Sequence, residues 1–321
     1  MYARQWSVRL VAAAVCLVGM SFLAAASSVG AQPETLRPET SPLTGTAAGF
    51  TLGNIHLARD DQFAGTLPAR SVTSDGETAT GNARRFTAEE ATEPLPEPWT
   101  FNVQPTYTRQ NGGGGTGYLQ LQPILRFDLG LPLAMRFEWP IPKVDYQQSG
   151  STVAGVGDLT WLTVLFLGQS ERWGKLGLGS VFVFPTASQE QLGQGKYQVG
   201  PALYYVNKAV RGWQFALLAQ QFFSFAGDPG RSDISQLKLQ PFVTAYLPDS
   251  WYVESKPVIT LDFKKHTSSV PLDLVIGRVV AGRWNLYVEG TGFPAWTSKP
   301  TNNYTITINI GYVTESLLHR R

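Results

Sequence analysis

The stretch YTITINIGY, residues 304–312, decides the fold because its side chains alternate strictly in character. One face of an extended chain here is apolar with a tyrosine at each end, and the other face is small and polar. Nine residues match the roughly 9 to 11 residues that a tilted membrane strand needs. Tyrosines at both ends match the two aromatic girdles of outer-membrane barrels. The stretch therefore predicts a strand of a transmembrane barrel.

Period-2 alternation continues from Trp99 onward and predicts further strands. In residues 99–109, aromatic and apolar side chains take one face, and threonine, asparagine and glutamine take the other. Residues 118–128, 133–145 and 251–263 repeat the pattern. Only 16% of the chain is charged, below the roughly 25% of soluble domains. Short turns alternate with longer loops, as in outer-membrane barrels. The sequence thus predicts an all-β fold, a transmembrane antiparallel up-and-down β-barrel of about 12 strands.

Prolines recur in the middle of the predicted strands, in V-Q-P at 103–105, L-Q-P at 121–123, V-G-P at 199–201 and L-Q-P at 239–241. Proline lacks the N–H group that a strand ladder uses, and it normally marks an edge. A closed barrel has no edge. We therefore expect each proline to mark a local bulge or bend.

The N-terminus reads as a secretory signal peptide over residues 1–31. Two arginines precede an apolar core at 10–26, and V-G-A at 29–31 favours cleavage after Ala31. An uncleaved anchor helix is the alternative. Cys16 lies within the apolar core and disfavours a lipoprotein. Cleavage leaves no cysteine, and it leaves 24 of the 26 basic residues against 24 acidic ones. This balance gives no support to nucleic-acid binding.

Residues 32–97 show no sustained period and are rich in Pro, Thr, Gly, Ala and charged residues. We expect a disordered periplasmic extension there, or a segment that folds back as a plug in the lumen. The barrel itself is expected over 98–313, followed by a C-terminal tail at 314–321. Barrel proteins commonly end on an aromatic residue that the barrel-assembly machinery recognises, and here the last strand ends near Tyr312.

Charged residues within the predicted strands fall on the polar, inward face, where they avoid a cost of about 2 to 4 kcal/mol per basic residue at the lipid midplane. Inside, they can form pairs or line a wet pathway. They are candidates for a selectivity-setting constriction; the alternative is a network of salt bridges that fills the lumen. The residues are Arg126, Asp128, Arg136, Glu138, Lys238, Glu254, Lys256 and Asp262.

Catalytic candidates are few. The chain has three histidines, and no pair of them has metal-ligand spacing. His266 and Ser268 could form a base and nucleophile pair of an outer-membrane lipid hydrolase, with Asp262 orienting the imidazole. The alternative is a solvated outer loop, in which Lys264 and Lys265 contact lipopolysaccharide phosphates. We expect no enzyme, no catalytic residues, no metal and no cofactor.

Residues 155–203 resemble a family of Gram-negative outer-membrane barrels named for the meta-cleavage pathway of phenol degradation. The resemblance rests on G-V-G-D at a strand start, on P-T after the next strand, and on a later V-G-P strand. Ala187 stands where that family's P-T-G glycine would be. The matching residues are Gly155, Gly157, Asp158, Pro185, Thr186, Gly200 and Pro201.

By this resemblance, the implied function is passive passage of small molecules, hydrophobic or aromatic ones included, across the cell outer membrane. The alternative from another class is a nonconducting barrel with a structural or surface-binding role. A lipid hydrolase using His266 and Ser268 is the third. The expected partners are outer-membrane lipid, lipopolysaccharide, the barrel-assembly machinery and a solute of unknown identity.

Overall fold

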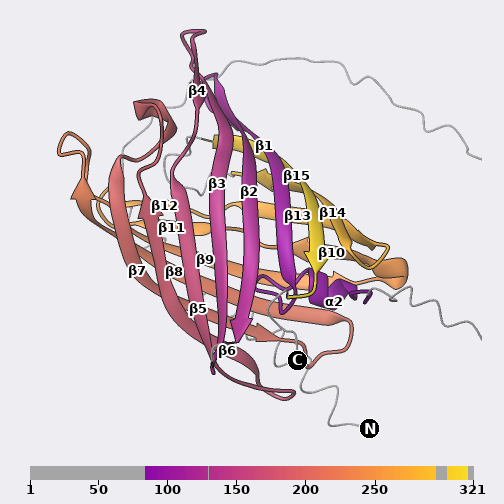
Figure 1. Cartoon of the computed structure of the whole chain (residues 1–321). Coiled ribbons are helices and arrows are strands. Elements are labelled where there is room, and N and C mark those ends of the chain that lie inside the picture. Colours follow the sequence, from indigo (N-terminus) through magenta and orange to yellow (C-terminus); the bar gives the residue numbers. More distant parts are fainter. Residues whose placement is uncertain (1–83, 129, 294–301, 317–321) are drawn as a thin grey trace, which may run out of the picture. The chain divides into compact units, whose positions relative to one another are not determined.

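Strands dominate the computed structural model, which describes residues 84–128, 130–293 and 302–316 (Figure 1). They form one closed antiparallel barrel. The predicted signal peptide, most of the predicted extension and the end of the C-terminal tail lie outside the described residues. The strands are β1 (Trp99–Gln110), β2 (Gly115–Asp128), β3 (Pro132–Tyr146), β4 (Thr152–Gly155), β5 (Leu159–Ser170), β6 (Gly174–Phe184), β7 (Lys196–Asn207), β8 (Trp213–Gly227), β9 (Ser235–Tyr246), β10 (Trp251–Ser255), β11 (Ile259–Asp262), β12 (Thr267–Ser269), β13 (Leu272–Val280), β14 (Trp284–Gly292) and β15 (Asn302–Thr314).

These segments amount to twelve barrel strands, because three barrel strands are each built from two segments. β4 and β5 both pair with β3. β10 and β11 share one register on β9, in which Glu254 lies opposite Thr244 and Ile259 lies opposite Leu239. β12 and β13 lie along β11 and β10 in the same way. The prediction of a transmembrane-type barrel with about 12 strands is confirmed.

Closure depends on pairing between the first and last strands. β1 runs antiparallel to β15, with Val103 opposite Ile310 and Tyr107 opposite Ile306. The rest of the circle passes through β9, β10 and β13. Among the described strands the ladder runs full circle, so most backbone groups of the wall are paired across strands, as a lipid environment requires.

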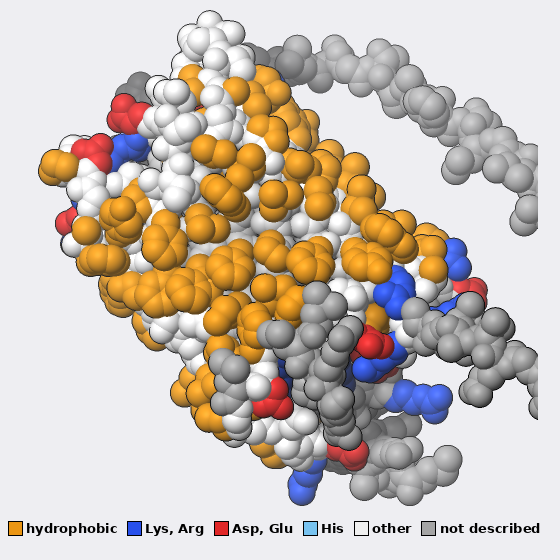
Figure 2. All heavy atoms as spheres, viewed as in Figure 1, with side chains coloured by type: hydrophobic (Ala, Val, Ile, Leu, Met, Phe, Trp, Pro, Cys, Tyr) orange, Lys and Arg blue, Asp and Glu red, His pale blue; other side chains and the backbone are white. Residues whose placement is uncertain are grey.

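The outer face of the barrel is apolar, the reverse of a soluble protein, and much of the inner face is polar. On β15, Ile308 is 47% exposed whereas the next residue, Asn309, is 1% exposed. Figure 2 shows apolar side chains covering much of one outer face, with charged residues gathered toward the ends. Exposed apolar surface of this extent indicates that the wall faces lipid.

Prolines do not produce the expected bulges. Between β1 and β15 the register is the same before and after Pro105, and only the pairing at the proline is lost. Pro201 interrupts the β7–β8 ladder in the same way. Register shifts occur elsewhere, at Arg109/Gln110, Tyr118/Gln120, Phe166/Gly168 and Tyr197/Gln198. A bulge was wrongly expected at Pro105 and Pro201, because a proline removes one donor only and the intact pairs beside it hold the register.

Residues 84–98, which we call the inner segment, precede β1 and pack against inward-facing side chains of the barrel. They include the helix α2 (Ala88–Ala91), which begins with a capping box between Thr87 and Glu90. Phe86 lies in a buried cluster with Tyr252 and Val275. Two short 3₁₀ helices, η1 (Glu190–Leu192) and η2 (Pro248–Ser250), lie in the connections. No helix in the described part of the chain is long and apolar enough to cross a membrane.

We predict that Ile308→Lys destabilises the folded barrel in phospholipid vesicles by about 2 to 4 kcal/mol, since it places a cation at the lipid midplane. The free energy of unfolding, measured by denaturant titration in vesicles, tests this. Asn303→Lys is the matched control, because Asn303 is exposed and lies beyond the Tyr304 girdle. Equal stability of the two variants would contradict a lipid-facing β15.

Candidate functional site

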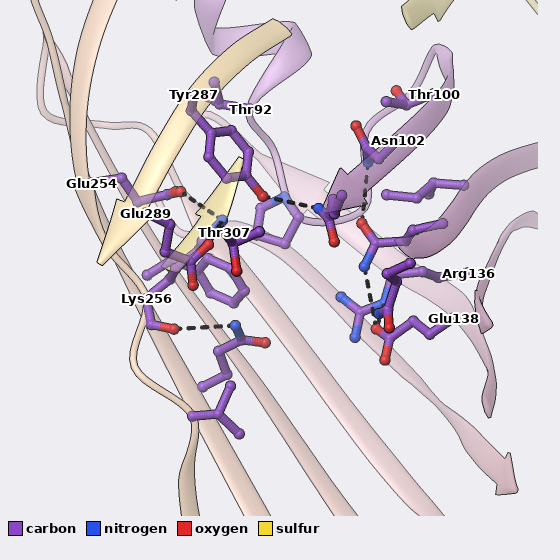
Figure 3. Close-up of a pocket in the computed structure, with 18 of the residues that line it drawn as sticks. Thr92, Thr100, Asn102, Arg136, Glu138, Glu254, Lys256, Tyr287, Glu289 and Thr307 are labelled. Atoms are coloured by element: carbon purple, nitrogen blue, oxygen red, sulfur yellow. Dashed lines mark hydrogen bonds and ion pairs between the residues drawn. The ribbon is translucent and has the colours of Figure 1, made fainter. Parts of the chain in front are cut away.

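A polar cavity of about 310 Å³ lies within the barrel. Its walls come from β1, β2, β3, β8, β9, β10, β14 and β15, and part of the inner segment also lines it. Charged side chains of both signs project into it (Figure 3). This arrangement follows from strand alternation, because each strand that presents apolar residues to lipid must present the residues between them to the interior.

One charged cluster lies on β3. The Arg136 guanidinium is 2.9 Å from the Glu138 carboxylate. A chain of amides extends this pair toward β1: Gln122 donates to Glu138 at 3.4 Å, and Asn102 donates to Gln122 at 3.1 Å. Most of Arg136 is buried, whereas about a quarter of the Glu138 side chain is exposed. The carboxylate is therefore the group that faces the open lumen.

A second cluster lies on β10 and β14, on the other side of the cavity in Figure 3. The Lys256 ammonium is 3.1 Å from Glu289 and 3.8 Å from Glu254. It also lies 4.0 Å from the ring centroid of Tyr287, within cation–π distance. Thr244 donates to Glu254 at 2.8 Å. Two carboxylates against one ammonium leave this cluster with one surplus negative charge when all three groups are ionised.

Uncharged side chains connect the wall between the two clusters. Gln104 donates to the Tyr287 hydroxyl at 2.9 Å and to Asn309 at 3.2 Å. Asn309 in turn donates to the backbone carbonyl of Asn285 at 2.8 Å. Because these amides are already hydrogen-bonded to one another, they hold the polar wall in a defined shape.

On β5 to β9, a buried apolar cluster packs on the inner side, beside buried polar residues such as Gln198 and Gln214. Its buried core includes Leu162, Val181, Leu218 and Phe222, and the inner segment contributes Leu95. Most of this cluster is closed off from the cavity, but Phe222 and Phe242 line it and give it an apolar side.

The inner segment forms one end of the cavity, because Thr92, Glu93 and Pro94 line it. Glu93 is buried and accepts from Lys175 and Lys208, each at 2.8 Å. Burial alone would raise the pKa of Glu93, but the two lysines outweigh burial and hold that pKa below its usual range.

Backbone contacts also hold the inner segment. The Phe86 amide donates to the Gly282 carbonyl in the β13–β14 turn at 2.8 Å. The hydroxyls of Thr92 and Tyr246 are 2.8 Å apart. Two hollows, of about 750 and 890 Å³, lie on either side of Glu97 and Pro98. The segment therefore narrows this end of the barrel without filling it.

Of the eight charged residues that the sequence places on the inner face, five line the cavity: Arg136, Glu138, Lys238, Glu254 and Lys256. The other three are not brought to it. Arg126 lies over the Phe166 ring, and with Asp128 it lines one hollow beside the inner segment. Asp262 ends β11, where its carboxylate accepts from the backbone amides of Lys264 and Lys265. These side chains near the strand ends point inward like the others, but they lie beyond the central cavity.

The geometry around His266 does not support a hydrolase. His266 is exposed in the turn between β11 and β12 and has a positive φ of 52°. One carboxylate oxygen of Asp262 caps this turn, and the other accepts from Gln236 at 2.8 Å. Asp262 thus stabilises a turn rather than orienting the imidazole. Within the described ranges, no group of three or more His, Cys, Asp or Glu side chains is placed to hold a metal ion.

The residues of the G-V-G-D and P-T motifs hold an outer loop together. The Asp158 carboxylate accepts from the backbone amides of Ala187 at 3.2 Å and Gln194 at 2.6 Å. The Thr186 hydroxyl donates to the Gly157 carbonyl at 2.9 Å. These contacts tie the start of β5 to the loop after β6. The group comprises Gly155, Gly157, Asp158, Pro185 and Thr186.

Gly200 and Pro201 lie apart from that loop, in the middle of β7. A side chain at Gly200 would overlap the carbonyl oxygen of Gln221 in β8. Glycine is therefore required for the close approach of these two strands, and Pro201 follows where the ladder to β8 is interrupted.

Sequence reasoning missed two groups of this site. Glu289 and Tyr287 lie on β14, whose alternation in W-N-L-Y-V-E-G-T-G could have indicated their inward direction. Glu93 had no such signal, because it precedes the first strand and lies in a stretch without a period.

Comparison with known proteins gives a likeness in fold. Neither protein-family models nor curated proteins match the sequence. An outer membrane channel from Pseudomonas putida F1 is similar in structure, with a TM-score of 0.56 and 12% identity over 70% of this chain and 98% of that one. NanC porin gives a TM-score of 0.48 and 10% identity, over 67% of this chain and 99% of that one. KdgM porin gives a TM-score of 0.40 and 11% identity, over 66% of this chain and 98% of that one.

We predict that Glu93→Gln weakens docking of the inner segment by about 3 kcal/mol, because it leaves two lysines without their buried counter-charge. Hydrogen–deuterium exchange of amides 86–96 measures the free energy of local opening. Glu97→Gln is the control, since the Glu97 side chain is 64% exposed and its pair with Lys175 is expected to contribute less than about 1 kcal/mol. Equal exchange in both variants would contradict the anchoring role of Glu93.

Docking of the inner segment should also depend on pH. Because the pKa of folded Glu93 lies below the ordinary value of 4.5, its stabilisation is complete above pH 4.5 and is lost as pH falls through the lowered pKa. Exchange protection of the same amides, corrected for intrinsic rates, should fall with acidification in the parent chain. The Glu93→Gln variant should lack this component. Protection that rises on acidification would contradict the assignment.

Proposed function

We propose that the chain is an outer-membrane barrel through which small molecules, hydrophobic or aromatic ones included, diffuse passively. The observation that carries the proposal is a closed, lipid-facing barrel around a polar cavity with charged clusters on two sides. The resemblance of residues 155–203 to the phenol meta-pathway family supports the same class of solute.

Location in the outer membrane follows from two features. The first 31 residues have the composition of an export signal. The wall is apolar around a closed strand circuit, and closed barrels are the form in which β structure crosses a membrane. Lipid, lipopolysaccharide and the barrel-assembly machinery are the partners that this location implies.

Selection of solutes would take place between the two charged clusters. Glu138 and Glu289 face the cavity with partly exposed carboxylates, at 27% and 19% side-chain exposure. Each lies beside a cation, so a solute meets both signs of charge within a short distance. Phe222 and Phe242 give the cavity an apolar side for the rest of the solute.

A nonconducting barrel that serves a structural or surface-binding role is the second candidate. The inner segment favours it, because buried contacts of Phe86, Glu93 and Leu95 hold this segment at one end of the cavity. The two functions differ in whether ions cross the folded barrel.

Planar-bilayer recording of the refolded mature chain separates them, after heat-modifiable migration on a gel has verified folding. Discrete conductance steps are expected for a diffusion pore. A folded barrel without steps, in repeated insertions, would overturn the pore and support the structural role.

We predict that Glu138→Gln and Glu289→Gln each lower the cation-to-anion permeability ratio. A unit charge 4 Å from a passing ion is worth about 1 kcal/mol in water, which corresponds to a change of about fivefold. Reversal potentials in a salt gradient measure the ratio. Glu190→Gln is the control, because Glu190 lies in an outer loop with 74% side-chain exposure. An unchanged ratio in both lumen variants would place the ion pathway elsewhere.

A further inference from the structure

Lys238 differs from the other two cations that line the cavity. Arg136 is paired with Glu138, and Lys256 is paired with Glu289. Lys238 forms no ion pair with any residue in the described ranges. Its ammonium lies instead over the ring of Phe222, 4.7 Å from the centroid. One cation of the cavity thus has no carboxylate of its own.

Both polar and aromatic side chains surround Lys238. Lys238 lies on β9 directly opposite Gln220 of β8. Gln240 is the next inward residue of β9, and both glutamines line the cavity with it. The Phe222 and Phe242 side chains are almost fully buried on the apolar side. Amide donors, two aromatic rings and one ammonium therefore border the same space.

Electrostatics favour an anion at this position. Lys238 is partly buried. An ammonium without a counter-charge is costly to desolvate, and a cation–π contact returns only about 0.5 to 2 kcal/mol. Arg136 and Glu138 line the same cavity as Lys238, and because they are paired at 2.9 Å their two charges largely cancel. A negatively charged oxygen of a solute would supply the counter-charge that Lys238 lacks, and it would accept a charge-assisted hydrogen bond from the ammonium.

The same surroundings limit the size and charge of that solute. A single ammonium matches one negative charge, and the carboxylates of Glu138 and Glu254 line the same cavity and would repel a second. A volume of about 310 Å³ is at the small end of ligand pockets. The phenylalanine rings offer contact to a flat or branched apolar body.

We propose that Lys238, together with Phe222 and Phe242, forms a binding site for small organic monocarboxylates that carry an apolar body. The proposal rests on the proposed function, since such a solute must enter the lumen. It adds a substrate class and names the residue that recognises the charge. Acetate, which lacks the apolar body, and benzyl alcohol, which lacks the charge, should bind more weakly than benzoate.

Two measurements on the folded mature chain test this site with benzoate as the probe. Isothermal titration calorimetry in detergent measures binding whether or not the barrel conducts. Block of single-channel current by benzoate measures binding on the ion pathway. Lys238→Gln should weaken binding about tenfold or more, as loss of a charge-assisted hydrogen bond predicts. Lys265→Gln, in the exposed turn after β11, is the matched control and should leave binding unchanged.

Further variants keep the result interpretable. Lys238→Arg retains the charge and should bind benzoate more tightly than Lys238→Gln does, and both are checked for heat-modifiable folding. Phe222→Leu should weaken benzoate more than acetate. Benzoate binding that is absent in the parent chain, or equal in the parent and Lys238→Gln, would overturn the site. Absence of conductance steps together with Lys238-dependent binding would overturn the pore but not the site.

Discussion

Pairing of β1 with β15 is the constraint on which the rest of the structure depends. A strand that faces lipid has no water to satisfy its backbone, so every N–H and C=O must find a partner in the wall. The β1–β15 ladder supplies those partners and removes the edge from the sheet. Where proline or a strand break interrupts the wall, side chains take over: Gln240 donates to the Lys256 carbonyl, and Asp273 accepts from the Lys256 amide. Both backbone groups of Lys256, at the junction between β10 and β11, are thus hydrogen-bonded.

Closure also decides the chemistry of the lumen. Because one face of each strand contacts lipid, the other faces of all strands border one narrow interior. Charged side chains from strands far apart in sequence therefore meet there. Lys256, just after β10, and Glu289 on β14 are 33 positions apart in sequence, yet their charged atoms lie 3.1 Å apart. Such pairs compensate charges that would otherwise be costly to bury. Lys238 has no such pair among the described residues and lies over the Phe222 ring instead.

The inner segment gives the two ends of the barrel different properties. Phe86 and Leu95 bury apolar area against inward-facing strand residues, and Glu93 joins two lysines from β6 and the β7–β8 turn. Apolar burial depends little on pH, whereas the Glu93 pairs depend on ionisation. The segment is therefore held by apolar contacts that depend little on pH and by ion pairs that weaken in acid. Both lie at the end of the cavity that the segment lines.

The sequence by itself determined the strand alternation, the approximate strand number and the inward direction of most charged residues. These are local properties, because a period of two is set by backbone geometry and is visible in stretches such as 304–312. Only the tertiary structure decided which inward charges pair, that Asp128 and Asp262 lie at strand ends away from the cavity, and that Glu93 enters the site. Those outcomes depend on register, on barrel curvature and on contacts between segments far apart in the chain. No local pattern encodes them, since each is fixed only when β1 meets β15 and the interior closes.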